Sequence, residues 1–190
     1  MNSIQRIGVV GAGTMGSGIA EVAAVAGFTV WLGDTLSEQL GKGRRTIEAS
    51  LEKAARRGKL SGSEPDAVLS RISFGSDLSD LGDCDFVVEA IVENVQAKMQ
   101  LHAELGRITR PEIVLASNTS SISITKLGES SGRPERFVGM HFFNPVPVMP
   151  LVEIVAGRGT SEATMIATEE LARRIGKTPV RAKDAPGFVA

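Results

Sequence analysis

The chain has 190 residues, of which 42% are hydrophobic and 23% charged, and its formal net charge is -1. This length and composition are typical of one folded domain with a full core, exclude an intrinsically disordered chain and give no support to a nucleic-acid-binding role. Its single cysteine, Cys84, cannot form an internal disulfide, and it has no apolar run of roughly 18 residues that could span a bilayer. The first residues also lack the pattern of a secretory signal. We therefore expect a cytoplasmic protein that binds neither nucleic acid nor membrane.

Short apolar runs alternate with helical patterns along most of the chain, beginning with a strand over 4–10 and a helix over 14–26. Further strands are predicted over 28–32, 72–74, 86–89 and 113–116, and further helices over about 36–55, 66–69 and 95–108. The spacing of Thr35 and Glu38 predicts a capping box at the start of the long helix. Strands that alternate with helices in this way indicate a parallel sheet covered on both faces.

The pattern changes near the C-terminal end, where two strand-like segments over 137–140 and 151–155 are separated by only about ten residues. This length is marginal for a helical crossover, and Pro145, Pro147 and Pro150 disfavour a helix there. We therefore predict an antiparallel hairpin, followed by a helix over 161–175 and a strand over 179–182.

A glycine motif, Gly11-Ala12-Gly13-Thr14-Met15-Gly16, follows the first strand directly and opens the first helix. Its first glycine permits a tight turn, its second lets the backbone approach a pyrophosphate, and its third lets the helix pack on the strand. Asp34 lies 18 residues after Gly16, where a carboxylate can bind ribose hydroxyls and would repel a 2′-phosphate. The alternative is a glycine-rich turn with a surface aspartate, which the order of strand, turn, helix and acid disfavours.

The motif therefore predicts a site for NAD rather than NADP within a Rossmann-type, doubly wound and mostly parallel α/β fold. The predicted cofactor-binding residues of this segment are Gly11, Gly13, Thr14, Met15, Gly16 and Asp34.

Polar residues follow three further strands at their carboxyl ends, where ligands bind in open parallel sheets. Ala90 and Glu93 follow one strand, the segment Ser117-Asn118-Thr119-Ser120-Ser121 follows the next, and His141 ends a third. Ser120 or Ser121 could instead cap the next helix, and Glu93 could be an acid favoured at a helix start.

In the predicted hairpin, residues whose numbers sum to about 294 face one another, which places Glu153 beside His141. Glu153 shares a strand face with Leu151 and Val155, so it is partly desolvated and needs a partner. A histidine held by a carboxylate has a fixed tautomer and can transfer a proton near neutral pH. The alternative is a satisfied core histidine with Glu153 on a solvated edge. The other histidine, His102, lies on a helix of mixed polarity and is predicted to be at the surface.

Together these features resemble the L-3-hydroxyacyl-CoA dehydrogenase family, which includes the 3-hydroxybutyryl-CoA dehydrogenases. The matching stretches are GAGTMGSGIA, DFVVEAIVEN, SNTSS, HFFNPVPVMPLVE and KDAPGFV. The resemblance implies reversible, NAD-dependent oxidation of (S)-3-hydroxyacyl-CoA to 3-oxoacyl-CoA in fatty-acid metabolism. It implies that His141 is the catalytic base, that Glu153 orients it, and that Ser120 contacts substrate and cofactor. It further implies contacts to the cofactor at Glu93, Lys98 and Asn144, and to coenzyme A at Ser50 and Arg57, the latter where a lysine is usual.

Members of this family continue after PGFVA with an active-site asparagine and a mainly helical, dimer-forming domain, whereas this sequence ends at Ala190. The resemblance thus predicts an NAD-binding domain over 1–185, the start of a link over 186–190, and weakened turnover with retained NAD binding. No metal site is predicted. Two other functions stay open: a dehydrogenase of a free hydroxy acid, and a non-catalytic NAD-binding module.

Overall fold

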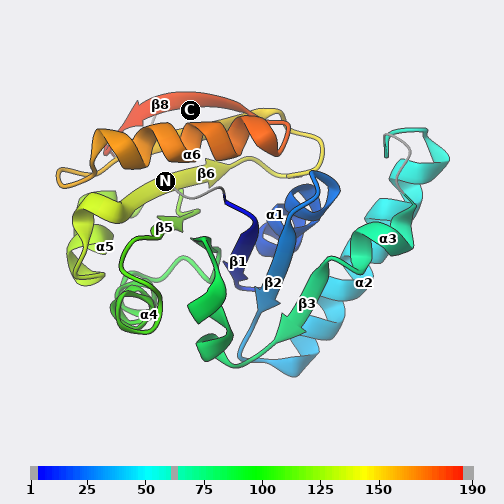
Figure 1. Ribbon diagram of the computed structural model, residues 1–190, viewed down its shortest axis with the longest axis horizontal. Coiled ribbons are helices and arrows are strands. Elements are labelled where there is room, and N and C mark those ends of the chain that lie inside the picture. The colour runs from blue at the N-terminus through cyan, green and yellow to red at the C-terminus, as the bar shows by residue number, and fades with distance from the viewer. Residues whose placement is uncertain (1–3, 61–63, 186–190) are drawn as a thin grey trace.

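Residues 4–60 and 64–185, the part of the chain that the structure describes, form an eight-stranded sheet flanked by helices in the computed structural model (Figure 1). The strands are β1 (Arg6–Val10), β2 (Thr29–Gly33), β3 (Ile72–Gly75), β4 (Phe86–Glu89), β5 (Val114–Ser117), β6 (Phe137–Phe142), β7 (Leu151–Ala156) and β8 (Thr178–Lys183). The α-helices are α1 (Thr14–Val25), α2 (Ser37–Arg56), α3 (Pro65–Leu69), α4 (Val95–Ile108), α5 (Ile124–Ser130) and α6 (Glu162–Arg174), and two 3-10 helices are η1 (Leu78–Asp83) and η2 (Pro134–Arg136). Within these ranges no helix is long and apolar enough to cross a membrane.

The strand order is β3-β2-β1-β4-β5-β6-β7-β8. Neighbouring strands are parallel except for the antiparallel pair β6 and β7. The chain runs outward from β1 to β3, returns to place β4 on the other side of β1, and then continues outward in the opposite direction. The predicted doubly wound sheet with one antiparallel pair is therefore confirmed, and its switch point lies between β1 and β4, where such sheets bind ligands.

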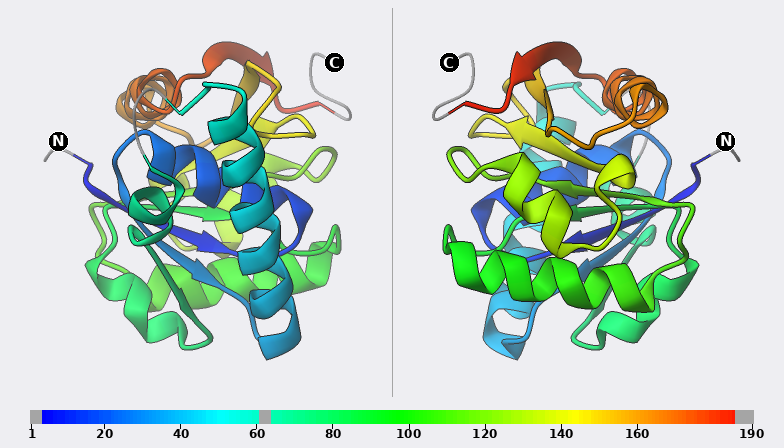
Figure 2. Two further views of the ribbon diagram at one scale, coloured as in Figure 1. Left: turned by 90° about the vertical axis from the view of Figure 1, so that its right-hand side faces the viewer. Right: turned by 90° about the vertical axis from the view of Figure 1, so that its left-hand side faces the viewer.

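Helices cover both faces of the sheet, and the two opposite views of Figure 2 show α2 on one side and α4 with α5 on the other. Ile19 of α1 and Leu171 of α6 belong to one core cluster, which also includes Val88. Leu105 of α4 belongs to a second cluster, which includes Val87. Because successive strand residues point to opposite faces, adjacent residues of β4 enter different cores. The central strands β1, β4 and β5 are thus buried on both sides and read as continuous apolar runs.

Two details at helix ends differ from the prediction. The capping box at Thr35 is wrong, because Leu36 is the N-cap of α2 and its side chain makes no cap. Instead, Asp34 Oδ1 accepts a hydrogen bond from the Leu36 N–H at 3.0 Å. Neither Ser120 nor Ser121 caps the next helix, because Ser123 is the N-cap of α5, a helix whose bounds the sequence pattern did not predict. The predicted link over 186–190 lies outside the described residues, so the domain boundary stays a prediction.

Asp184, which directly follows β8, ties this end of the sheet to the start of α5. Its carboxylate accepts hydrogen bonds from the N–H groups of Ile124 and Thr125, both at 2.9 Å, and from Thr125 Oγ1 at 2.6 Å. Burial alone would raise the pKa of Asp184, but these hydrogen bonds outweigh it and lower the pKa. The ionised carboxylate therefore stabilises the fold.

We expect Asp184→Asn to be less stable than the wild type at neutral pH, because the charge that receives these hydrogen bonds is lost. A lowered folded pKa gives stability that is present above the unfolded pKa, about 3.9, and is lost as pH falls through the folded pKa. The difference in free energy of unfolding should therefore narrow below about pH 4 in urea titrations. A difference that stays constant across that range would contradict this role of the charge.

Candidate active site

The glycine motif forms a tight turn between β1 and α1 that only glycine fits at two positions. Gly11 has φ +107°, and a Cβ there would lie 2.6 Å from the Ala90 carbonyl oxygen. A Cβ on Gly16 would lie 1.7 Å from the Gly11 carbonyl oxygen. Gly13 is the N-cap of α1 and has no capping side chain, and a Cβ there would meet no atom within 4 Å beyond its own chain neighbours, among the described residues. The turn is therefore fixed by packing at Gly11 and Gly16 and left open at Gly13, which fits the approach of a pyrophosphate to the helix N-terminus.

This contrast separates folding from cofactor binding. Gly16→Ala should lower the free energy of unfolding by about 1–3 kcal/mol through overpacking. Gly13→Ala should leave it unchanged, because the residue has φ -71° and ψ -170°, which alanine adopts readily. Its methyl group would nevertheless stand where the cofactor approaches, so we expect NADH affinity to fall about tenfold, the effect of losing one charge-assisted hydrogen bond. Calorimetric titration with NADH and urea denaturation measure the two effects, and normal NADH binding by Gly13→Ala would contradict the assignment.

A cleft of about 650 Å³ opens beside this turn at the carboxyl end of the sheet. Its lining includes the predicted residues Gly11, Gly13, Thr14, Met15, Asp34 and Ala90, together with apolar side chains such as Leu36, Ile91 and Val92. Asp34 Oδ2 accepts a hydrogen bond from the Ala12 N–H at 2.9 Å, which fixes the carboxylate at the end of β2. The cleft thus offers an apolar wall and one oriented carboxylate, an arrangement suited to an adenosine.

The hairpin of β6 and β7 holds the predicted proton-transfer pair. The two strands pair in the register that sets His141 opposite Glu153, so the predicted juxtaposition is confirmed. His141 Nδ1 lies 2.7 Å from Glu153 Oε2, and Glu153 is only 1% exposed. A carboxylate at Nδ1 favours the tautomer with its proton on that nitrogen, which makes Nε2 the basic nitrogen of the ring. The geometry is that of a histidine oriented to receive a proton at Nε2.

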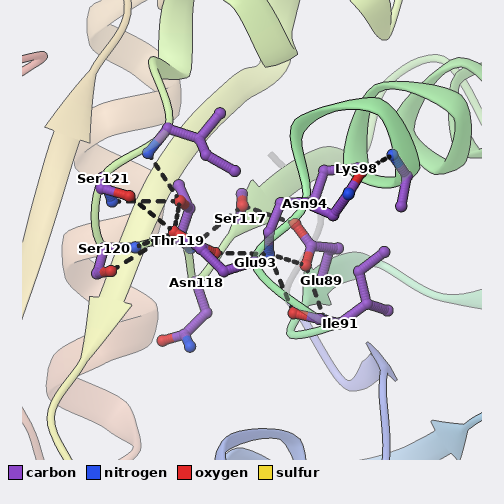
Figure 3. Close-up of polar contacts among 12 residues, drawn as sticks. Glu89, Ile91, Glu93, Asn94, Lys98, Ser117, Asn118, Thr119, Ser120 and Ser121 are labelled. Atoms are coloured by element: carbon purple, nitrogen blue, oxygen red, sulfur yellow. Dashed lines mark hydrogen bonds and ion pairs between the residues drawn. The ribbon is translucent and has the colours of Figure 1, made fainter.

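Next to the cleft residue Ile91 lies a cluster of charged side chains, of which Glu89 and Lys98 are buried (Figure 3). Lys98 Nζ lies 2.5 Å from Glu89 Oε1 and 3.4 Å from Glu93 Oε2, and Lys98 is only 1% exposed. Lys98 therefore faces two carboxylates of its own chain, and the implied contact to the cofactor stays a prediction. Glu93 is no simple helix-start acid, because Glu93 Oε1 accepts hydrogen bonds from Thr119 Oγ1 at 2.5 Å and the Ser120 N–H at 3.1 Å.

The prediction of His102 as a surface residue is wrong. His102 is fully buried, and its Nε2 lies 3.2 Å from Glu89 Oε2. Lys98 and His102 are four residues apart on α4, so both side chains point to the end of β4, where Glu89 is also fully buried. Sequence reasoning also gave no role to Asn118, whose Oδ1 accepts a hydrogen bond from the Phe142 N–H at 2.9 Å and so joins β5 to β6.

The other predicted site residues lie on two loops or on α2, outside the lining of the cleft. Ser120 and Asn144 are exposed, the first on the loop after β5 and the second on the loop after β6. Ser50 Oγ donates a hydrogen bond to Glu21 Oε1 at 2.7 Å, and Arg57 is exposed at the end of α2. The carboxyl group of Glu21, which Ser50 contacts, is itself buried, and this burial raises its pKa to about 7. The structure therefore brings the glycine motif, Asp34 and Ala90 into one cleft, and places Ser50 and Arg57 on a separate helix.

The open switch point, the glycine turn and the carboxylate after β2 define a Rossmann-type dinucleotide-binding domain. A family model described as "3-hydroxyacyl-CoA dehydrogenase, NAD binding domain" matches residues 6–185. The chain therefore belongs to the 3-hydroxyacyl-CoA dehydrogenase family, and its cofactor is NAD.

Similar proteins carry related names. The chain is 54% identical over 185 residues to a "Probable 3-hydroxybutyryl-CoA dehydrogenase" of Deinococcus radiodurans, covering 97% of this chain and 66% of that protein. It is 49% identical over 190 residues to a 3-hydroxybutyryl-CoA dehydrogenase of Mycobacterium tuberculosis, covering 99% of this chain and 66% of that protein. The crystal structure of (S)-3-hydroxybutyryl-CoA dehydrogenase PaaH1 from Ralstonia eutropha matches with TM-score 0.96 and 44% identity, over 99% of this chain and 66% of the other. The chain thus spans just under two thirds of the length of these relatives.

Proposed function

We propose that this chain carries the cofactor site and the proton-transfer pair of an NAD-dependent 3-hydroxyacyl-CoA dehydrogenase. The reaction converts (S)-3-hydroxyacyl-CoA and NAD to 3-oxoacyl-CoA, NADH and a proton, and runs in both directions. The observation that carries this proposal is the pair His141 and Glu153, held at the same edge of the sheet as the NAD cleft. The names of the similar proteins support the substrate class.

In this mechanism His141 Nε2 takes the proton of the substrate's 3-hydroxyl group, while the hydride at C3 leaves with its electron pair. The cleft lined by Gly11, Gly13 and Asp34 would hold NAD, whose nicotinamide would supply the hydride acceptor. Glu153, buried beside Nδ1, stabilises the positive charge that forms on the imidazole ring. In the reverse direction His141 returns the proton to the oxygen of the 3-oxo group. We further propose that Ser120, from the loop held by Glu93, contacts substrate and cofactor.

The end of α2 favours a coenzyme A ester over a free acid. Arg57 is exposed there, with Lys53, Arg56 and Lys59 nearby in the sequence and also exposed. Such a basic cluster attracts the phosphates of coenzyme A, and Ser50 is the proposed polar contact on the same helix. A homodimer of the longer relatives and a cytoplasmic location stay predictions.

The test follows NADH absorbance after acetoacetyl-CoA or free acetoacetate is added to the chain. We expect oxidation of NADH with acetoacetyl-CoA, little with acetoacetate, and competition by free coenzyme A. Equal rates with both substrates, without such competition, would favour a dehydrogenase of free hydroxy acids. NADH binding without turnover of either substrate would favour a non-catalytic module.

A further inference from the structure

The carboxylate of Glu89 lies at the end of β4, and donors surround it on both oxygens. Oε1 accepts hydrogen bonds from the Ile91 N–H at 2.8 Å and from Lys98 Nζ at 2.5 Å. Oε2 accepts a hydrogen bond from Ser117 Oγ at 2.6 Å and lies 3.2 Å from His102 Nε2. A buried charge with this many donors is held in one orientation.

The charge on Glu89 decides which nitrogen of His102 carries a proton. Burial alone would raise the pKa of Glu89, but the hydrogen bond of His102 and the positive charge of Lys98 outweigh it and lower the pKa to about 2. Glu89 is therefore an acceptor only, and His102 Nε2 donates to it. His102 Nδ1 is buried without a hydrogen-bond partner in the described part of the chain, and the ring packs edge-on against Phe137 at 4.6 Å. The one polar contact of this buried ring is thus Glu89, within the same described ranges.

Glu89 affects the cleft through Ile91, because Ile91 is one of the residues that line the cleft. Glu89 Oε1 accepts a hydrogen bond from the Ile91 N–H, and Lys98 Nζ donates a hydrogen bond to the Ile91 carbonyl oxygen at 3.3 Å. Both backbone groups of one cleft residue are therefore fixed by the same ion pair.

The same cluster also holds the loop after β5. Ser117 Oγ donates a hydrogen bond to Glu89 Oε2, and Lys98 Nζ lies 3.4 Å from Glu93 Oε2. The other oxygen of Glu93, Oε1, accepts a hydrogen bond from the Ser120 N–H. Figure 3 shows these side chains converging between the two loops. The buried carboxylate of Glu89 thus contacts both the loop after β4, which lines the cleft, and the end of β5, from which the second loop starts.

We propose that His102 is a positioning residue of the NAD site, which acts through Glu89 on the loops 90–94 and 117–121. By donating a hydrogen bond to Glu89 Oε2, His102 holds the Glu89 carboxylate in one orientation. In that orientation Glu89 Oε1 accepts hydrogen bonds from the Ile91 N–H and from Lys98 Nζ. This inference rests on NAD binding alone and is independent of the proposed reaction.

The test compares His102→Leu with His102→Gln by calorimetric titration of the chain with NADH. Leucine fills the buried space without a donor, whereas the glutamine amide can place an N–H group near the position of Nε2. We expect the dissociation constant for NADH to rise about tenfold in His102→Leu, the factor that corresponds to one hydrogen bond to a charged group, and to stay near the wild-type value in His102→Gln. The melting temperature of each variant is measured alongside.

Ser117→Ala provides a second approach, because it removes the other donor to Oε2 and leaves the histidine in place. It should weaken NADH binding in the same direction, and it keeps the test decisive if His102→Leu does not fold. A lower melting temperature with unchanged NADH affinity in the variants that fold would overturn the proposal, as would equal losses in His102→Leu and His102→Gln. Since no substrate is added, a failure of the proposed reaction would not affect the outcome.

Discussion

Replacing His141 with glutamine is expected to lower the rate of acetoacetyl-CoA reduction by about 10²–10⁴-fold, the usual contribution of a positioned acid–base group. Glutamine retains hydrogen-bonding groups beside Glu153 but cannot exchange a proton near neutral pH. NADH affinity should not change, because His141 is absent from the lining of the cleft that contains the glycine turn. Steady-state rates, together with calorimetric titration by NADH, measure both effects.

Glu153→Gln is the matched variant for this experiment. It keeps an oxygen that can accept the hydrogen bond from His141 Nδ1, which lies 2.7 Å from the native carboxylate, but it removes the charge. We expect a smaller loss of rate than in His141→Gln, because the ring stays oriented while its protonated form is less stabilised. A His141→Gln variant with near wild-type turnover would contradict the assignment of the base, and an equal loss of NADH affinity would point to a binding role instead.

Replacing Glu89 with leucine is expected to lower the free energy of unfolding by about 3–5 kcal/mol, because it leaves a buried charge without its partner. Lys98 is 1% exposed and has its shortest ion pair, 2.5 Å, with Glu89. Its second carboxylate, on Glu93, is 3.4 Å away and 41% exposed, so it cannot compensate fully. Urea denaturation at neutral pH measures the loss.

The control is Glu52→Gln, which breaks an exposed ion pair of α2. Glu52 and Arg56 are 3.7 Å apart, with side chains 63% and 72% exposed. Exposed ion pairs contribute little to stability, so we expect no resolvable change in the free energy of unfolding of Glu52→Gln. If Glu89→Leu were as stable as this control, the buried cluster would not contribute to the stability of the fold.

The part of the site that the sequence predicted correctly depends on local rules. The glycine turn follows from strand, turn and helix in direct succession, and the pairing of His141 with Glu153 follows from a short connection and the two-residue period of strands. Both of these predictions depend only on segments that are neighbours in the sequence. The register of β6 and β7 therefore came out as predicted.

His102 was misplaced because its environment depends on distant segments. Polar residues on α4 suggest a solvated face, yet the polar face that contains Lys98 and His102 is buried against the end of β4. The i,i+4 spacing of two basic side chains near a carboxylate at a strand end is a signal that could have found it. The bounds of helix α5 were missed for a similar reason, because the helix has only seven residues and its N-terminus is held by Asp184, 60 positions beyond Ile124.

The most direct test of the proposed reaction uses NADH that carries deuterium at both C4 positions. The chain is incubated with this NADH and acetoacetyl-CoA, and the 3-hydroxybutyryl-CoA formed is analysed by mass spectrometry, which detects even slow turnover. We expect deuterium at C3 of the product with the wild type, and about 10²–10⁴-fold less labelled product with His141→Gln over the same incubation time. An unlabelled substrate pool, recovered from wild-type protein that binds NADH normally, would contradict hydride transfer in this site.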